Sequence, residues 1–203
     1  MTTVYLAGPM VFWPNADDVF NEMKRILMQH GLEGIAPVDN QASLESIPPG
    51  PLLAAAIYEA DAQLMRRVDA AIFCLDPFRR GTEMDAGTAF EVGFCKALGL
   101  PMTAWTTDGR LYPEKVRDHI RALSGESLRQ SGRNTTGAMS GALRDPDGIL
   151  VHSDGMVQNL MIQQAIELGG GHVHVATRWQ DAFAAAAEHL LRLMQTGMRA
   201  NGT

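Results

Sequence analysis

Residues 69–105 read DAAIFCLDPF, RRGTEM, DAGTAFEVGFCKALGL and PMTAW, which is an apolar run, a polar turn, an amphipathic segment and a second apolar run. Nearly continuous apolar runs such as these are typical of parallel strands covered on both faces. The segment 85–100 between them has helical spacing and begins with Asp. The stretch therefore predicts a strand, a helix and a second parallel strand.

The same alternation continues toward both ends of the chain. We expect further strands over 3–8, 34–38 and 171–177, and helices over 15–31, 52–68, 155–170 and 179–195. Five parallel strands with helices on both faces predict an α/β, flavodoxin-like doubly wound sheet in the order 2-1-3-4-5. The last eight residues, 196–203, are expected to fray.

Residues 106–152 interrupt this rhythm. Gly, Ser, Arg, Asn and Asp dominate there, and only short helical stretches such as 114–123 are evident. A chain of 203 residues with 46% apolar content suits one core. We therefore expect a single domain over 1–203 with a long insertion loop at about 106–152.

The composition excludes several classes of partner. A net charge of −6 offers no basic field for a phosphate backbone, so a nucleic acid polymer is not expected. No apolar run approaches the roughly 18 to 20 residues of a membrane helix, and no cationic region precedes the first apolar run. Cys74 and Cys95 lie in apolar runs, as reduced core thiols do. These features favour a cytoplasmic protein with a small neutral ligand and no membrane contact.

Ligands of open parallel sheets bind beyond the carboxyl ends of the strands. The loops 8–15, 39–51 and 76–87 and the insertion 106–152 should therefore surround one pocket. Within these loops the residues 8–13 (GPMVFW) are apolar and lack the serine-rich donors that a 5′-phosphate would need. Arg79 and Arg80 leave the question of phosphate binding open.

Two carboxylates mark the helix of the opening stretch. Asp85 opens that helix and Glu91 follows inside it, with Cα atoms on the order of 9 Å apart at a rise of about 1.5 Å per residue. This spacing can span a nucleobase and its glycosidic carbon. Burial between Phe90 and Val92 would raise the pKa of Glu91 unless a hydroxyl such as that of Tyr5 holds the charged form. The alternative roles are a helix cap for Asp85 and a solvated side chain for Glu91.

Three other short patterns accompany this pair. Tyr5 to Pro9 (YLAGP) ends a strand with a glycine, Gly8, that lets a ligand approach the backbone. Asp61 lies on the helix before the third strand, and Asn159 to Met161 (NLM) lies early in a helix. Taken singly, the first pattern is more simply explained by a core tyrosine and the second by a surface carboxylate, and the third is explained equally well by packing.

Together, in this order, the four patterns resemble the nucleoside 2-deoxyribosyltransferase family. The most specific one is D-x-G-[ST]-A-F-E-x-G-F, which stands here at 85–94. The insertion and the approach to NLM resemble the longer, purine-preferring branch. The resemblance implies that Glu91 is the nucleophile and that Tyr5 orients it. It also implies that Asp85 and Asp61 contact the base, with Asp85 the better candidate for proton delivery.

The other expected contacts surround the same substrate. Gly8 and Gly87 provide close backbone approach, and Phe12 and Trp13 resemble an apolar wall for a flat base, although packing in a turn explains them equally well. In the family a neighbouring subunit lends the Asn and Met of NLM to the sugar site. Asn159 and Met161 therefore imply a homo-oligomer.

The implied reaction transfers 2-deoxyribose between purine bases, with 2′-deoxynucleosides and free nucleobases as the small-molecule partners. A carboxylate below the sugar stabilises the oxocarbenium-like transition state and forms a glycosyl ester, which a second base then attacks. No metal and no organic cofactor is expected. A deoxynucleoside or deoxynucleotide N-glycoside hydrolase on the same fold is the first alternative. A non-catalytic nucleotide-binding module is the second.

Overall fold

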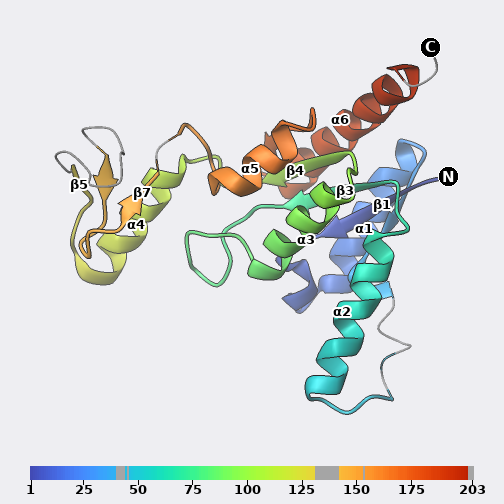
Figure 1. Ribbon diagram of the computed structural model, residues 1–203, viewed down its shortest axis with the longest axis horizontal. Coiled ribbons are helices and arrows are strands. Elements are labelled where there is room, and N and C mark those ends of the chain that lie inside the picture. The colour runs from blue at the N-terminus through green and yellow to red at the C-terminus, as the bar shows by residue number, and fades with distance from the viewer. Residues whose placement is uncertain (40–43, 45, 131–141, 153, 201–203) are drawn as a thin grey trace.

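The central feature of the fold is a parallel five-stranded sheet with helices on both faces, seen in a computed structural model (Figure 1). The structure describes residues 1–39, 44, 46–130, 142–152 and 154–200. The strands are β1 (Thr2–Ala7), β2 (Leu32–Ile35), β3 (Ala70–Cys74), β4 (Met102–Thr106) and β8 (Val173–Val175). Their order is β2-β1-β3-β4-β8, and all pairs are parallel, so the predicted α/β fold and strand order are confirmed.

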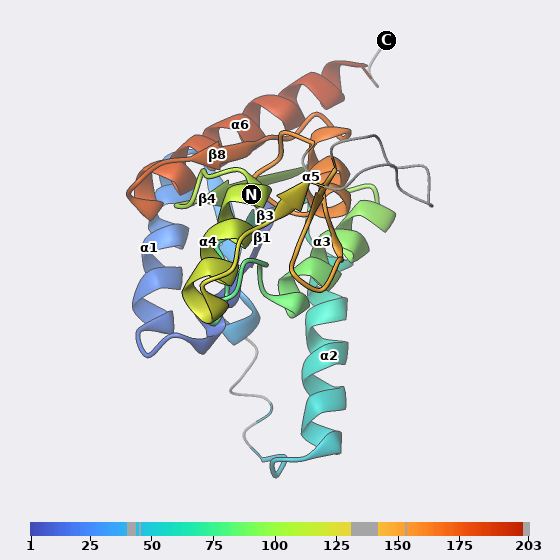
Figure 2. The same ribbon diagram turned by 90° about the vertical axis from the view of Figure 1, so that its left-hand side faces the viewer.

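The helices form two layers, one on each face of the sheet (Figure 2). One layer contains α1 (Ala16–Gln29) and α6 (Trp179–Ala200), and the other contains α2 (Pro51–Met65), α3 (Ala86–Ala97) and α5 (Leu160–Glu167). A short 3-10 helix, η1 (Pro9–Phe12), follows β1.

Alternation along β1 decides which side chains reach which layer. Val4 and Leu6 belong to the apolar cluster under α1 and α6, whereas Tyr5 and Ala7 belong to the cluster under α3 and α5. Successive side chains of a strand point to opposite faces, so Tyr5 is directed at the helix that carries Glu91.

The insertion contains more regular structure than the sequence predicted. It holds α4 (Tyr112–Ser124) and a small antiparallel sheet of β5 (Arg129–Gln130), β6 (Leu143–Arg144) and β7 (Leu150–Val151), which together extend from the body in Figure 1. The helical stretch expected over 114–123 is confirmed as α4, which covers Tyr112–Ser124, whereas the small antiparallel sheet was not predicted. The first turn of α4 is capped by Glu114, whose carboxylate accepts from the Leu111 amide at 2.8 Å, and Gly125 ends the helix at φ 74°.

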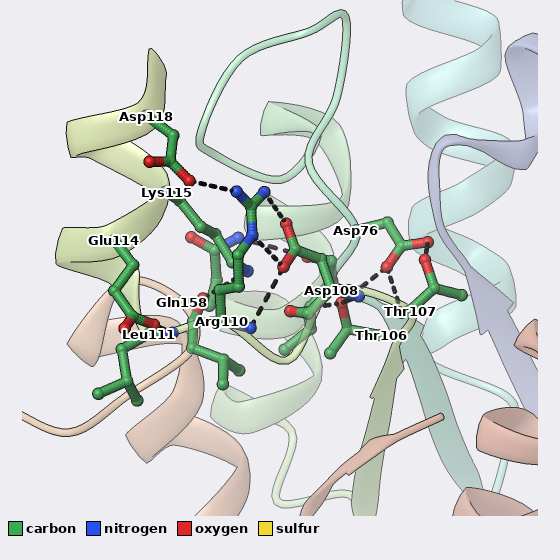
Figure 3. A network of polar contacts seen from close by, with 12 residues as sticks. Asp76, Thr106, Thr107, Asp108, Arg110, Leu111, Glu114, Lys115, Asp118 and Gln158 are labelled. Atoms are coloured by element: carbon green, nitrogen blue, oxygen red, sulfur yellow. Dashed lines mark hydrogen bonds and ion pairs between the residues drawn. The ribbon is translucent and has the colours of Figure 1, made fainter. Parts of the chain in front are cut away.

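Asp76, just after β3, ties the carboxyl ends of two neighbouring strands together (Figure 3). One of its carboxylate oxygens accepts from the Thr106 hydroxyl at 2.7 Å and from the Thr107 amide at 2.6 Å. The other accepts from the Thr107 hydroxyl at 2.9 Å. These bonds fix the point at which the insertion leaves β4.

Further polar contacts hold α4 against the sheet edge (Figure 3). The Lys115 ammonium is buried and donates to the Val157 carbonyl at 2.8 Å. Arg110 donates to Asp108 and to Asp118, at 2.7 Å each. The Lys115 bond therefore joins the insertion to the segment before α5, and the Arg110 contacts connect the start of the insertion to α4.

Several predicted boundaries differ from those observed. The second strand was expected over 34–38, but it covers Leu32–Ile35, because its register with β1 ends at Ile35. A turn then follows, in which the Asp39 carboxylate accepts from the Ala36 amide at 2.9 Å.

The helix expected over 155–170 is also shorter, since α5 covers only Leu160–Glu167. The Val157 amide donates to the Gln163 side chain at 3.0 Å instead of to a helical carbonyl, and Asn159 caps the helix. At the other end of the chain the predicted fraying begins too early, because α6 continues to Ala200. Residues 201–203 lie outside the described residues.

Two expectations about environment can be compared with the structure. Cys74 and Cys95 are both buried and unbridged, as predicted for core thiols. Across the described ranges, no helix combines the length and the apolar character needed to cross a bilayer.

Replacing Asp76 with alanine should destabilise the protein by about 1–3 kcal/mol, because the buried Thr106 hydroxyl and the Thr107 amide lose their acceptor. Asp147→Ala, at an exposed carboxylate of the insertion, is the control and should change stability by less than about 0.5 kcal/mol. Urea denaturation measures both. Equal stabilities of the two variants would contradict the anchoring role of Asp76.

Candidate active site

The centre of the candidate site is a hydrogen bond between β1 and α3. The Tyr5 hydroxyl donates to Glu91 Oε1 at 2.6 Å, and the Tyr5 ring is fully buried in the core. Because the tyrosine is fixed by packing, it also fixes the carboxylate. One oxygen of Glu91 is held by Tyr5, and the carboxyl group itself reaches the surface of a cavity.

Asp85 holds the start of the same helix in place. It is the N-cap of α3, and its Oδ2 accepts from the Thr88 amide at 2.9 Å and from the Thr88 hydroxyl at 3.1 Å. The sequence proposed both a cap and a functional carboxylate for this residue, and the cap is confirmed. The capping bonds set the position of the helix that carries Glu91 six residues later.

The cavity has a volume of about 270 Å³ and lies at the carboxyl ends of the strands. Five of the polar and glycine residues that the sequence predicted for the site line this cavity: Gly8, Asp61, Asp85, Gly87 and Glu91. The aromatic Phe12 lines it as well. Three carboxylates from two helices thus converge on one small space next to the first strand.

The apolar lining was largely missed by sequence reasoning. It consists of Val11, Pro37, Leu44, Ile57 and Ala60. Helical spacing was a usable signal for two of these residues on α2, because Ile57 precedes Asp61 by four residues and Ala60 follows Ile57 by three. The distant Pro37 and Leu44 gave no such signal. No described residue of the insertion lines the cavity, although we expected that loop at the pocket.

Position 8 has no room for a side chain larger than that of glycine. A Cβ atom there would come within 2.6 Å of the Cys74 Cβ and within 2.6 Å of the Met10 sulfur. The backbone after β1 therefore passes directly over β3, which keeps the floor of the cavity close to the sheet. At Gly87 a Cβ would lie 3.0 Å from the capping oxygen of Asp85.

Besides the buried Tyr5, three predicted residues do not line this cavity. Trp13 packs against the core cluster under α1 and α6. Asn159 caps α5, where its side chain accepts from the Met161 amide at 3.0 Å. The Met161 side chain is 72% exposed. Within the single chain, then, the aromatic wall is Phe12 alone, and no residue of the NLM segment lines the cavity.

Burial shapes the electrostatics of the site. Desolvation raises the pKa of Glu91 to about 8; the Tyr5 hydrogen bond opposes this shift, and the charges of Asp61 and Asp85 add to it. Desolvation also raises the pKa of Asp61 to about 6. Burial, followed by the Glu91 charge, raises the pKa of Tyr5 well above its usual range, so the phenol stays a donor.

This arrangement has a definite chemical capacity. A carboxylate held by one phenol can act as a nucleophile through its second oxygen, and an aspartate with a raised pKa can carry a proton. Within the ranges that the structure describes, His, Cys, Asp and Glu form no group of three or more that could hold a metal ion.

A larger hollow of about 900 Å³ lies at the opposite edge of the sheet, among Met1, Asp69, Lys96 and Pro101. Its lining contains one acidic residue, Asp69. The smaller cavity is the better candidate site because it holds the three carboxylates whose environments differ.

Comparison with known proteins agrees with this geometry. A protein of Schizosaccharomyces pombe that is described as uncharacterised is 46% identical over 187 residues, which cover 92% of this chain and 87% of the relative. Among solved structures, a 2-desoxiribosyltransferase from Leishmania mexicana is 27% identical, with a TM-score of 0.60 and coverage of 93% of this chain and 99% of the other.

A conserved protein from Enterococcus faecalis V583 shares the fold, with a TM-score of 0.55, 19% identity and coverage of 93% of this chain and 98% of the other. The profile of the family described as nucleoside 2-deoxyribosyltransferase matches residues 4–161, a range that includes Tyr5, Asp61, Asp85 and Glu91. From its sequence and its fold, this chain belongs to the nucleoside 2-deoxyribosyltransferase family.

Proposed function

We propose that this chain transfers 2-deoxyribose between nucleobases, with purines preferred, by double displacement through a covalent deoxyribosyl ester of Glu91. The observation that carries the proposal is the 2.6 Å bond from the Tyr5 hydroxyl to Glu91, at a cavity shared with Asp61 and Asp85. The solved relative from Leishmania mexicana, named as a deoxyribosyltransferase, supports the same reaction class. In this role the chain serves purine salvage in the cytoplasm without a cofactor.

The first displacement forms the ester. The second oxygen of Glu91 attacks the anomeric carbon as the bond to the base breaks, and the electron pair of that bond leaves with the base nitrogen. Tyr5 donates to the first oxygen and so holds the carboxylate in one orientation. The incoming base then attacks the same carbon from the face that the first base left, which releases Glu91 and retains the β configuration.

The departing base needs a proton, and two carboxyl groups are candidates. The sequence favoured Asp85, whose Oδ2 accepts two hydrogen bonds from Thr88 at the start of α3. Burial raises the pKa of Asp61 to about 6, so near neutral pH this group holds a proton for part of the time. Asp61 is therefore a second proton donor to consider beside Asp85.

Base exchange tests the proposal directly. Incubation with deoxyinosine and adenine should yield deoxyadenosine and hypoxanthine, separated by liquid chromatography, because the ester transfers its sugar to the second base. Cytosine in place of adenine should be a poorer acceptor if purines are preferred. Release of free deoxyribose without a new nucleoside would instead indicate a hydrolase, and absence of any turnover would favour a binding module.

The Glu91→Gln variant should lose transfer activity by several orders of magnitude, because the amide cannot form the ester. The same variant should be more stable than the wild type at pH 8, because burial penalises the ionised form of Glu91 and raises its pKa to about 8. We expect a difference of about 1–2 kcal/mol, which is less than the full pKa shift would give, because the side chain is partly exposed and solvent screens its charge.

The sign of that stability difference follows from proton binding. Between the ordinary glutamate pKa and about 8, the folded state binds a proton that the unfolded state has lost, so stability falls as pH rises. The advantage of the variant should therefore shrink toward pH 4.5. Thermal denaturation at both pH values measures it. A wild-type rate in this variant would refute the covalent role, and a pH-independent difference would refute the raised pKa.

We also propose a homo-oligomer in which Asn159 and Met161 of one subunit complete the sugar site of its neighbour. In support, Met161 is 72% exposed, and neither residue lines the cavity of its own chain. Two aromatic side chains on α2 and α3 are exposed as well, Tyr58 by 52% and Phe90 by 48%, with ring centroids 5.9 Å apart. Apolar surface of this kind is typical of subunit interfaces.

Mixing two inactive variants tests the shared site. Glu91→Ala and Asn159→Ala subunits should regain transfer activity after exchange, because some sites then contain a native half from each chain. Glu91→Ala mixed with Tyr5→Phe is the control and should not regain activity, since both changes affect the same half. Equal recovery in the two mixtures, or none in the first, would contradict shared residues.

A further inference from the structure

The loop between β3 and α3 has an unusual backbone at its tip. Arg79 and Arg80 have φ values of 50° and 62°, and among the described residues they are the non-glycine residues with positive φ. This conformation is unfavourable for a long side chain and persists where surrounding contacts hold it. Here the Phe78 amide donates to the Glu83 carbonyl and the Gly81 amide to the Phe78 carbonyl, at 2.9 Å each.

The insertion braces the same loop from outside. The Tyr112 hydroxyl donates to the Glu83 carboxylate, and the Tyr112 ring stacks on His152 with centroids 4.1 Å apart. The loop thus reaches from β3 to α4, as its course between the body and the insertion in Figure 1 indicates. Contacts on both sides keep its tip in the strained conformation.

That conformation places the Arg79 guanidinium over two aromatic rings. Its central carbon lies 4.8 Å from the centroid of Phe78 and 5.8 Å from that of Phe12. The two rings are 5.3 Å apart and tilted by 30°. Phe12 belongs to the loop after β1 and Phe78 to the loop after β3, so the cation joins loops of two neighbouring strands.

Phe12 matters because it lines the cavity of the carboxylates although 58% of its surface is exposed. Phe12 is the last residue of η1 and belongs to neither core cluster, so a neighbour that holds its ring also shapes the cavity wall. Arg79 does not itself line the cavity. Cation–π contact within about 6 Å is attractive and directional enough to provide this support.

We propose that Arg79 is a positioning residue, which holds Phe12 as the aromatic wall for the purine and thereby sets the affinity for the base. The inference depends on the proposed function for the identity of the ligand. Arg79 acts through Phe12 and does not touch the ligand. The adjacent Arg80 has the same backbone conformation without a recorded contact to either ring, and it provides a matched control.

The test is a double-mutant cycle on the binding of adenine, measured by calorimetry. Arg79→Ala keeps a side chain in the strained conformation and removes the guanidinium, so binding should weaken by about two- to fivefold. In the Phe12→Ala background the same change should have no further effect, because its target is gone. Arg79→Lys should recover part of the loss, and Arg80→Ala should bind as the wild type does.

Several results would overturn the proposal. An equal loss from Arg79→Ala with and without Phe12 would mean that the arginine contacts the ligand itself. A loss seen with deoxyadenosine monophosphate and not with adenine would assign it to the phosphate. Unchanged affinity in Arg79→Ala, an equal loss in Arg80→Ala, or no measurable adenine binding by the wild type would also refute it. The cycle measures adenine binding and does not need turnover. If it gives the expected pattern in a protein that shows no transfer activity, the role of Arg79 stands and only the proposed function is rejected.

Discussion

The structure of the site depends on one hydrogen bond, from a phenol fixed in the core to a carboxylate at the edge of a cavity. Tyr5 is held by packing on all sides, and its hydroxyl, 2.6 Å from Glu91, transmits that rigidity to the acid. Even with this donor, desolvation holds the pKa of Glu91 at about 8, and without it the neutral acid, which is a poor nucleophile, would be favoured further. The bond therefore opposes desolvation and directs the carboxylate at the same time.

The fold makes this bond possible through simple alternation and capping. The strand β1 presents every second side chain to the layer of α3, and Asp85 fixes where that helix begins. Two helices then bring Asp61 and Glu91 to one cavity, where each meets a different degree of burial. In the free protein Glu91 therefore keeps its proton to a higher pH than Asp61 does, and it must lose that proton before it can act as a nucleophile.

Sequence reasoning was most successful where short-range periodicity decides the outcome. The parallel order and the cap at Asp85 follow from alternating strands and helical spacing, whereas the pairing of Tyr5 with Glu91 was implied by the family resemblance. The structure contains all three. Sequence reasoning failed where side chains replace regular backbone bonds. The start of α5 lies later than predicted because the Gln163 side chain binds the Val157 amide.

Residues brought together by loops were also beyond prediction. Trp13 and Phe12 are adjacent in the sequence, yet one packs on the core and the other lines the cavity, because η1 ends between them. The extent of α4 was underestimated because polar residues dominate it, and its stability derives from capping and charge contacts more than from an apolar stripe.

The manner in which the insertion is attached has a consequence for its dynamics. Of the residues described between 107 and 150, none belongs to either apolar core cluster, and the attachment depends on groups such as Asp76, Arg110 and Lys115. A segment with few buried apolar contacts is of the kind that opens locally while the sheet stays closed. Its amide hydrogens would then exchange with solvent well before those of β1 and β3. Evolution could likewise alter the insertion at little cost to the fold beneath it.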